Sequence, residues 1–154
     1  WVGDLLQELG FTPYLMTTGS RGLHVVAPLD GAAGFDDVRA FARDVAEQLA
    51  KSHPDALTTE QRKAARGGRL YLDVMRNAYG QTAVMPYSLR AKPGAPVATP
   101  LDWHELGDGD LDAQRYTLGN LFRRLGQKDD PGSGMQRRAK GIEAARSSLA
   151  ALGA

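Results

Sequence analysis

Cysteine is absent from the 154-residue sequence, and so is any apolar run near the roughly 20 residues that a membrane-spanning helix requires. Without cysteine the chain has no disulfides and no thiolate metal sites, which fits a reducing cytoplasm. Without a long apolar run we expect a soluble, cytoplasmic protein with no membrane partner. Internal repeats are also missing, and the length suits one core but not two, which predicts a single domain over residues 1–154.

The two ends of the chain carry different signals. The sequence begins at Trp1 and shows no basic-then-apolar leader, so we expect part of something longer and not a secreted precursor. The first 114 residues hold 11 basic and 15 acidic side chains, whereas the last 40 hold 8 basic and 3 acidic ones. A basic C-terminal segment can steer a protein towards nucleic acid, although a solvated helical face is the more ordinary explanation.

Apolar spacing and breaker residues predict an α/β (α+β) fold with a mixed, largely antiparallel sheet flanked by helices. Helices are expected over residues 2–9, 35–49, 118–125 and 135–152. Strands are expected over residues 14–18, 23–28 and 69–75, with an irregular edge strand over 82–90, extended chain over 91–100 and a turn over 103–106. Residues 53–68 form a polar connection with at most a short helix. Residues 1–112 then carry the candidate motifs, and residues 113–154 form a helical end.

A glycine-bounded turn joins the first two expected strands. It reads Thr18-Gly19-Ser20-Arg21-Gly22-Leu23-His24. A five-residue connection from Gly19 to Leu23 would place Thr18 opposite His24, so that a hydroxyl and an imidazole meet on one face of the hairpin.

The same turn has the chemistry of an anion site. Gly19 and Gly22 permit positive φ and a close approach of backbone to ligand, so the N–H groups of the turn can surround an anion. Arg21 adds a planar fork of donors, and phosphate is the natural guest. An ordinary hairpin with a solvated polar tip is equally compatible with this spacing, which is neither a Walker sequence nor a dinucleotide fingerprint.

Asp73 falls in the middle of the strand expected over residues 69–75, where aspartate is disfavoured. Its proposed face also carries Tyr71 and Met75, so the carboxylate needs a partner. A divalent cation would supply one, because Mg²⁺ and Mn²⁺ take carboxylate and phosphate oxygens. A salt bridge to Arg76 or Arg69 explains the residue equally well.

Further basic residues follow these motifs. Arg90 and Lys92 are two apart, so they would point to one side of an extended segment, and Arg76 follows the aspartate strand. These side chains could converge on phosphates, although most surface basic residues do nothing so specific. His53 and His104 lie in connections without a metal-ligand spacing, so both are expected to face solvent.

Four strings taken in order closely resemble one family over nearly the whole chain. They are MTTGSRGLHVVAPL, RLYLDVMRN, TAVMPYSLRAKPGAPVATPLDWHEL and YTLGNLFRRL. In this order they resemble the C-terminal portion of the polymerase domain of bacterial ATP-dependent DNA ligase D, a member of the archaeo-eukaryotic primase superfamily. The resemblance implies a primase-polymerase that adds ribo- or deoxyribonucleotides to a DNA 3′ end in non-homologous end joining.

The resemblance also implies roles for individual residues. The turn matches the family's second motif, in which Thr18, Ser20, Arg21 and His24 would bind the incoming nucleotide, although the family often has lysine at position 21. His24 would also belong to the catalytic set. Asp73 matches the third motif, a catalytic carboxylate that binds metal. The set is completed by a nucleotide-contacting arginine, Arg90, and by two basic residues of less defined role, Arg76 and Lys92.

One departure limits what the resemblance implies. The family binds two Mn²⁺ or Mg²⁺ ions mainly through a first motif, Asp-x-Asp at the end of a strand upstream of the helix expected over residues 2–9, and we expect this sequence to start after that motif. Asp4 and Asp36-Asp37 lie on expected helices without that spacing. We therefore expect that these residues do not polymerise by themselves, and a non-catalytic nucleotide- or nucleic-acid-binding module is the alternative.

The partners implied by the resemblance are DNA ends, NTP or dNTP, a ligase domain in the parent protein and an end-binding protein. A location at the nucleoid during repair follows from the same role. An apolar face left where missing strands normally pack would permit self-association.

Overall fold

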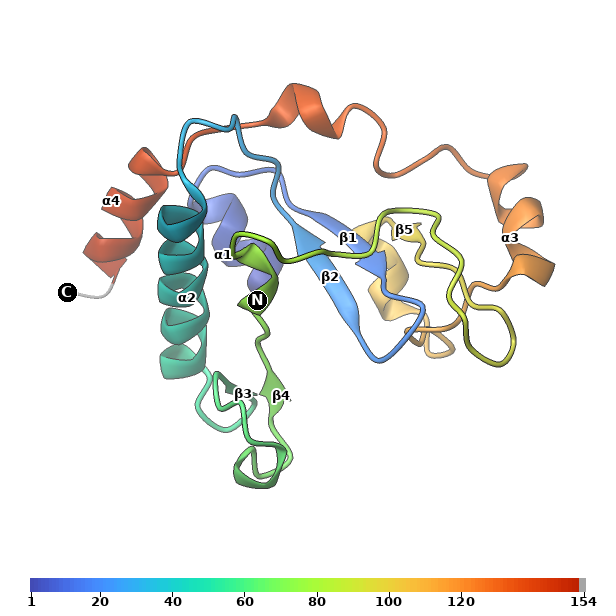
Figure 1. The fold of residues 1–154 in the computed structure, drawn as a ribbon, viewed down its shortest axis with the longest axis horizontal. Helices are drawn as coiled ribbons and strands as arrows, with labels where there is room; N and C mark the ends of the chain where they lie inside the picture. The colour runs from blue at the N-terminus through green and yellow to red at the C-terminus, as the bar shows by residue number, and fades with distance from the viewer. Residues whose placement is uncertain (153–154) are drawn as a thin grey trace. The chain divides into compact units, whose positions relative to one another are not determined.

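The structure, a computed structural model, describes residues 1–152 (Figure 1). The chain passes back and forth between two compact units. The first unit takes residues 1–10, 29–83 and those from 140 on, and the second takes residues 11–28 and 84–139. The predicted boundary between residues 112 and 113 and the predicted single domain stay predictions. Within residues 1–152, no helix combines the length and the hydropathy needed to cross a bilayer.

The first unit is built around one long helix. Its elements are α1 (Val2–Glu8), α2 (Phe35–Ser52), β3 (Leu57–Thr58), a 3₁₀ turn (Lys63–Ala65), β4 (Leu70–Tyr71), a second 3₁₀ turn (Met75–Asn77) and α4 (Glu143–Leu152). Apolar residues recur on α2 at helical spacing, and Phe41, Val45 and Leu49 are buried. This face packs against β3 and α4, while β3 and β4 pair in parallel. The helix predicted over residues 35–49 is confirmed and runs three residues further.

The second unit contains a three-stranded antiparallel sheet in the order β2-β1-β5. The strands are β1 (Tyr14–Thr17), β2 (Leu23–Val26) and β5 (Pro100–Leu101), and they are accompanied by 3₁₀ turns (Trp103–Gly107, Met135–Arg138) and by α3 (Leu118–Leu125). The predicted hairpin, the helix over residues 118–125 and the predicted fold class are confirmed, because the described part of the chain is a mixed α+β structure with an antiparallel sheet. Leu15 and Met16 on the central strand are both buried.

Two buried threonines join β1 to the segment that leads into β5. The Thr99 N–H donates to Thr17 Oγ1 at 3.0 Å, and the hydroxyls of Thr17 and Thr99 both donate to the Val97 carbonyl, at 3.4 and 2.9 Å. Both threonines are fully buried. The two hydroxyls thus serve as hydrogen-bond partners for backbone groups that the short pairing of β1 with β5 does not satisfy.

Several predicted elements are wrong. The final helix predicted over residues 135–152 is interrupted, because Lys140 pairs with Leu29 before α4 begins at Glu143. Residues 91–100 are not uniformly extended: the Ala95 N–H donates to the Lys92 carbonyl at 3.0 Å, which closes a turn. Pro-Gly at the centre of that turn, with Gly94 at a φ of 80°, is the residue choice of a type II turn.

The predicted edge strand over residues 82–90 is paired only in its last part. Backbone hydrogen bonds join residues 87–90 to residues 96–98, and they include the Arg90 N–H to the Pro96 carbonyl at 2.8 Å. The strand β3 was not predicted, because two residues are too few to show a period.

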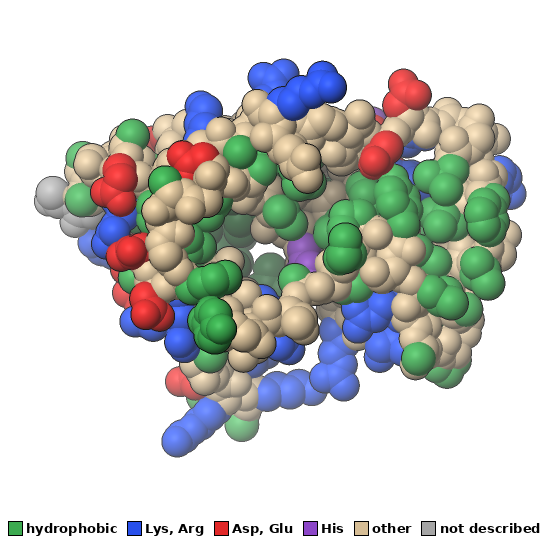
Figure 2. All heavy atoms as spheres, turned by 45° about the horizontal axis from the view of Figure 1, so that its top comes forward, with side chains coloured by type: hydrophobic (Ala, Val, Ile, Leu, Met, Phe, Trp, Pro, Cys, Tyr) green, Lys and Arg blue, Asp and Glu red, His purple; other side chains and the backbone are tan. Residues whose placement is uncertain are grey.

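Helix α3 presents an apolar face outward. Leu118, Phe122 and Leu125 recur at helical spacing and are 49%, 70% and 43% exposed. Figure 2 shows hydrophobic side chains gathered at its right-hand edge, on the α3 side of the second unit. The side of the helix that carries Leu121 and Arg124 turns inward.

We expect Thr17→Val to lower the free energy of unfolding by about 1–3 kcal/mol, because the buried Thr99 N–H loses its acceptor. The matched control is Thr99→Val, which costs less because the Thr17 hydroxyl still donates to the Val97 carbonyl. Urea denaturation of both variants measures the difference. A cost for Thr17→Val no greater than that for Thr99→Val would contradict the role given to the Thr17 hydroxyl.

Candidate functional site

The glycine-bounded turn of the second unit is organised by the hydroxyl of Thr18. Thr18 Oγ1 donates to the Gly22 carbonyl at 2.7 Å and accepts the N–H groups of Ser20 and Gly22 at 3.2 and 3.3 Å. The Thr18 N–H also donates to the Gly22 carbonyl at 3.0 Å. The hydroxyl therefore fixes the loop from within, as threonine does in turns of this kind.

This closure corrects the predicted register of the hairpin. Met16 is the partner of His24 and Thr17 is the partner of Leu23, so Thr18 does not face His24. The connection has the predicted length of five residues but begins one residue earlier, because the Thr18 hydroxyl bends the chain directly after β1. His24 instead shares a face with Met16, next to the turn on β2.

Two backbone N–H groups of the turn have no hydrogen-bond acceptor within residues 1–152. They are those of Gly19 and Arg21, whereas those of Ser20 and Gly22 are used inside the turn. Gly19 is buried, but Ser20 and Arg21 are accessible at the tip, and Arg21 is exposed. An anion at the tip would meet the amide donor and the guanidinium of Arg21.

Arg90 lies directly against this turn. Gly19 has a φ of 60° and is buried, and a Cβ built on it would come within 2.7 Å of Arg90 Cγ. The missing side chain of Gly19 therefore makes room for the stem of Arg90 across the backbone of the turn. The structure thus brings together four predicted nucleotide-binding residues, Thr18, Ser20, Arg21 and Arg90, from segments about 70 positions apart in the chain.

Lys92 does not extend alongside Arg90 as predicted. Its N–H donates to the Arg90 carbonyl at 2.8 Å, and its carbonyl closes the turn to Ala95. The alternation of an extended strand is therefore lost between positions 90 and 92. Lys92 is exposed at this turn.

Asp73 belongs to the first unit and does not lie in a strand. Strand β4 ends at Tyr71, and Asp73 Oδ1 accepts the Met75 N–H at 3.0 Å, which starts the 3₁₀ turn that follows. An aspartate that caps the backbone two residues on competes with strand pairing, which explains the wrong prediction. The carboxylate is exposed.

The alternative of a salt bridge for Asp73 is also wrong. Arg69 donates to the backbone carbonyls of Arg66, Ala65 and Pro54, and Arg76 donates to Gln81 Oε1 at 3.0 Å. Neither arginine forms an ion pair with Asp73 in the described part of the chain. Asp73 Oδ2 therefore has no protein partner there.

A metal pair needs more carboxylates than this segment supplies. Among residues 1–152, no group of three or more histidine, aspartate or glutamate side chains is placed to hold a metal ion. The residues present do not fit a two-metal centre, and Asp73 offers at most one ligand. His104 is exposed as predicted, whereas His53 is half-buried and stacks on Trp1 with ring centroids 4.1 Å apart.

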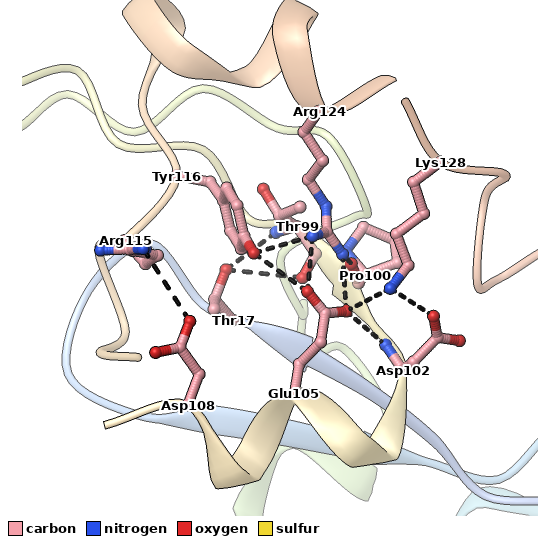
Figure 3. Close-up of polar contacts among 10 residues, drawn as sticks. All are labelled: Thr17, Thr99, Pro100, Asp102, Glu105, Asp108, Arg115, Tyr116, Arg124 and Lys128. Atoms are coloured by element: carbon pink, nitrogen blue, oxygen red, sulfur yellow. Dashed lines mark hydrogen bonds and ion pairs between the residues drawn. The ribbon is translucent and has the colours of Figure 1, made fainter. Parts of the chain in front are cut away.

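A buried ion cluster in the second unit was not found from the sequence. Arg124 of α3 donates to both oxygens of Glu105 at 2.6 and 2.8 Å, and Lys128 donates to the same carboxylate at 3.1 Å (Figure 3). The Asp102 N–H and the Tyr116 hydroxyl donate as well, at 2.8 and 3.1 Å. The only sequence signal was the Asp-x-x-Glu spacing of a capping box at residues 102–105.

These partners decide the protonation of Glu105. Burial alone would raise the pKa of the carboxyl, but the hydrogen bonds from Arg124, from the Asp102 N–H and from Lys128 outweigh it. The pKa of Glu105 is therefore held well below its usual range. The hydrogen bond that Arg124 donates to Glu105 in turn raises the pKa of Arg124. Both groups remain charged at neutral pH.

The chain is similar to LigD proteins of non-homologous end joining. The family profile described as "LigD, primase-polymerase domain" matches residues 1–132. The multifunctional non-homologous end joining protein LigD of Pseudomonas aeruginosa is 36% identical over 129 residues, which are 82% of this chain and 15% of that protein. The bifunctional non-homologous end joining protein LigD of Bacillus subtilis is 32% identical over 128 residues, 82% of this chain and 21% of that protein.

A solved structure shares the fold. The polymerase domain from Mycobacterium tuberculosis Ligase D, in complex with DNA, superposes with a TM-score of 0.82 at 31% sequence identity. The match covers 90% of this chain and 47% of that one. The chain thus spans about half of the solved domain and 15% to 21% of these curated relatives.

We expect Glu105→Gln to lower the free energy of unfolding by about 3 kcal/mol at pH 7, because two cations lose their buried partner. The folded pKa of Glu105 lies below the unfolded one, so its stabilisation is present above about pH 4.3 and is lost as the pH falls below that value. The difference between the two proteins, measured by urea denaturation from pH 7 to pH 2.5, should therefore shrink in acid. Glu47→Gln, on the exposed side of α2, is the control and should show neither effect.

Proposed function

The chain belongs to the primase-polymerase domain family of LigD, and from this membership we propose that it is part of a nucleotidyltransferase that adds NTP or dNTP to a DNA 3′ end in non-homologous end joining. Its relatives are named for that repair process, and the solved polymerase domain was in complex with DNA. In this proposal the second unit supplies the binding site for the nucleotide's phosphates.

The observation that carries the proposal is the contact between Arg90 and the turn. Arg90 packs over Gly19, and the N–H groups of Gly19 and Arg21 have no acceptor within residues 1–152. Arg90 and Arg21 are thereby proposed to contribute guanidinium groups to one site, together with the backbone N–H of Arg21 at the tip of the hairpin. This is a donor set for the oxygens of a triphosphate, because charge-assisted hydrogen bonds to phosphate are shorter and stronger than neutral ones.

Thr18, Ser20 and His24 complete the proposed site in different ways. The Thr18 hydroxyl can reach a phosphate only by giving up its hydrogen bond to the Gly22 carbonyl, so we assign it first to holding the turn. The Ser20 hydroxyl stands at the tip. His24 follows on β2, where a protonated imidazole would contribute a further donor and one positive charge to the phosphates.

For the first unit we propose that Asp73 gives one carboxylate ligand to Mn²⁺ or Mg²⁺. Its Oδ2 has no protein partner within residues 1–152, and hard divalent cations prefer such oxygens. Arg76 and Lys92 are proposed as additional contacts to nucleotide or DNA. The described residues do not assemble a metal pair, so we assign no chemical step to these ions.

The second candidate function is a non-catalytic nucleotide- or nucleic-acid-binding module. It is favoured by one observation: the donors of the turn are in place while no three-residue metal cluster is found among residues 1–152. In either case DNA ends, a ligase domain and an end-binding protein are proposed partners, and a cytoplasmic, nucleoid-associated location is proposed with them. Self-association through an apolar face left where missing strands normally pack is proposed as well.

We expect Arg21→Gln and Arg90→Gln each to weaken binding of inorganic tripolyphosphate to the chain by about tenfold, because each removes a charge-assisted contact. Isothermal titration calorimetry measures the dissociation constants. Arg123→Gln on α3 changes the net charge by the same amount, so it controls for long-range attraction and should leave affinity nearly unchanged. Equal, small effects from all three variants would refute the phosphate site.

Primer extension tests whether these residues polymerise by themselves. With manganese, a primed DNA template and nucleoside triphosphates, we expect no templated extension by the 154-residue chain, because Asp73 alone does not hold a metal pair. Extension products on a sequencing gel would overturn this expectation and would favour the enzyme over the binding module. The control is the same assay with Asp73→Asn, which should abolish any extension that the chain performs.

A further inference from the structure

A side chain distant in sequence holds the tip of the proposed phosphate-binding turn. Gln114 Nε2 donates to the Ser20 carbonyl at 2.9 Å, across 94 positions of the chain. Gln114 lies in the loop between the 3₁₀ turn Trp103–Gly107 and α3. No other side chain of the described residues bonds to a carbonyl at positions 19–21.

The loop that presents Gln114 is itself fastened on both sides. The Gln114 N–H donates to Asp112 Oδ1 at 2.7 Å, which closes a local turn. Arg115 lies 3.9 Å from both Asp108 and Asp110, and Tyr116 donates to Glu105 in the buried ion cluster. The amide of Gln114 is therefore carried by a segment whose position the cluster determines.

The peptide bond between Ser20 and Arg21 links this contact to the orientation of the Arg21 N–H. A trans peptide is planar, and its C=O and N–H point in opposite directions. Because the Ser20 carbonyl points to Gln114, the Arg21 N–H points away from it. That N–H is one of the two donors of the turn that lack an acceptor within residues 1–152.

We propose that Gln114 is a positioning residue of the phosphate site, which holds the peptide between Ser20 and Arg21 so that its N–H faces the anion. This inference rests on the proposed function of the turn. Without the Gln114 amide, the peptide can rotate and present its carbonyl oxygen to the same position, where it repels an anion. Gln114 touches no phosphate itself.

Gln114→Met tests the inference, because methionine keeps the length of the side chain and removes the donor. We expect the dissociation constant for inorganic tripolyphosphate to rise about fivefold, since one hydrogen bond that orients a donor is lost. The amide signal of Arg21 in ¹H–¹⁵N spectra should lose most of its tripolyphosphate-induced shift. Gln114→Glu, which cannot donate when ionised, should weaken binding at least as much.

Two controls separate positioning from stability. Gln127→Met makes the same exchange at an exposed position just beyond the C-terminal end of α3. This variant should bind tripolyphosphate as the parent chain does. Thr17→Val destabilises the sheet next to the turn but does not contact the peptide between Ser20 and Arg21. Under conditions where this variant is folded, the tripolyphosphate-induced shift of the Arg21 amide signal should therefore persist.

The outcomes separate failure of the proposed phosphate site from failure of the role given to Gln114. If the parent chain shows no tripolyphosphate-induced shift at residues 18–22, the proposed phosphate site fails and this inference fails with it. If the parent chain binds and Gln114→Met binds equally well, only the role of Gln114 is overturned. An equal loss in Gln114→Met and Gln127→Met, or loss of the Arg21 shift in Thr17→Val, would also overturn it.

Discussion

The carboxylate of Glu105 is the constraint on which the second unit depends. Five donors meet on it, and they come from α3, from the segment after it, from the loop before it and from the start of its own 3₁₀ turn. Such a carboxylate is unfavourable in a partly buried place unless every oxygen lone pair is used. Because Arg124 also donates to the Pro100 carbonyl at 2.9 Å, the cluster attaches α3 to β5 and so to the sheet.

The glycine-bounded turn at residues 18–22 is connected to this cluster by two routes. One runs through β5 and the buried threonines to β1, whose end is the start of the turn. The other runs through Tyr116 to Gln114 and the Ser20 carbonyl. A weakly paired hairpin tip, which alone would sample several conformations, is thereby held at two points.

Helix α3 combines an apolar and a charged contact on its inward side. That side carries the buried Leu121 and also Arg124, whose guanidinium meets the Glu105 carboxylate. Leu118, Phe122 and Leu125 lie on the other side and are exposed. One buried leucine and one ion pair therefore attach α3 to the second unit, and the other apolar residues of the helix stay outside.

The hairpin, the long helix, α3 and the family could be predicted from the sequence. Periodicity, glycine placement and motif strings are local or ordered along the chain, so they can be read without the fold. It predicted wrongly wherever one side chain outcompeted the regular pattern: the Asp73 carboxylate ended a strand, the Thr18 hydroxyl shifted a register and Pro93-Gly94 turned the chain at Lys92. Three contacts are seen only in the folded chain: Arg90 against Gly19, Arg124 with Glu105, and Gln114 with the Ser20 carbonyl. The residues of each pair are separated by between 19 and 94 positions in the sequence. No local rule of spacing predicts which distant side chains will share a charge or a backbone carbonyl.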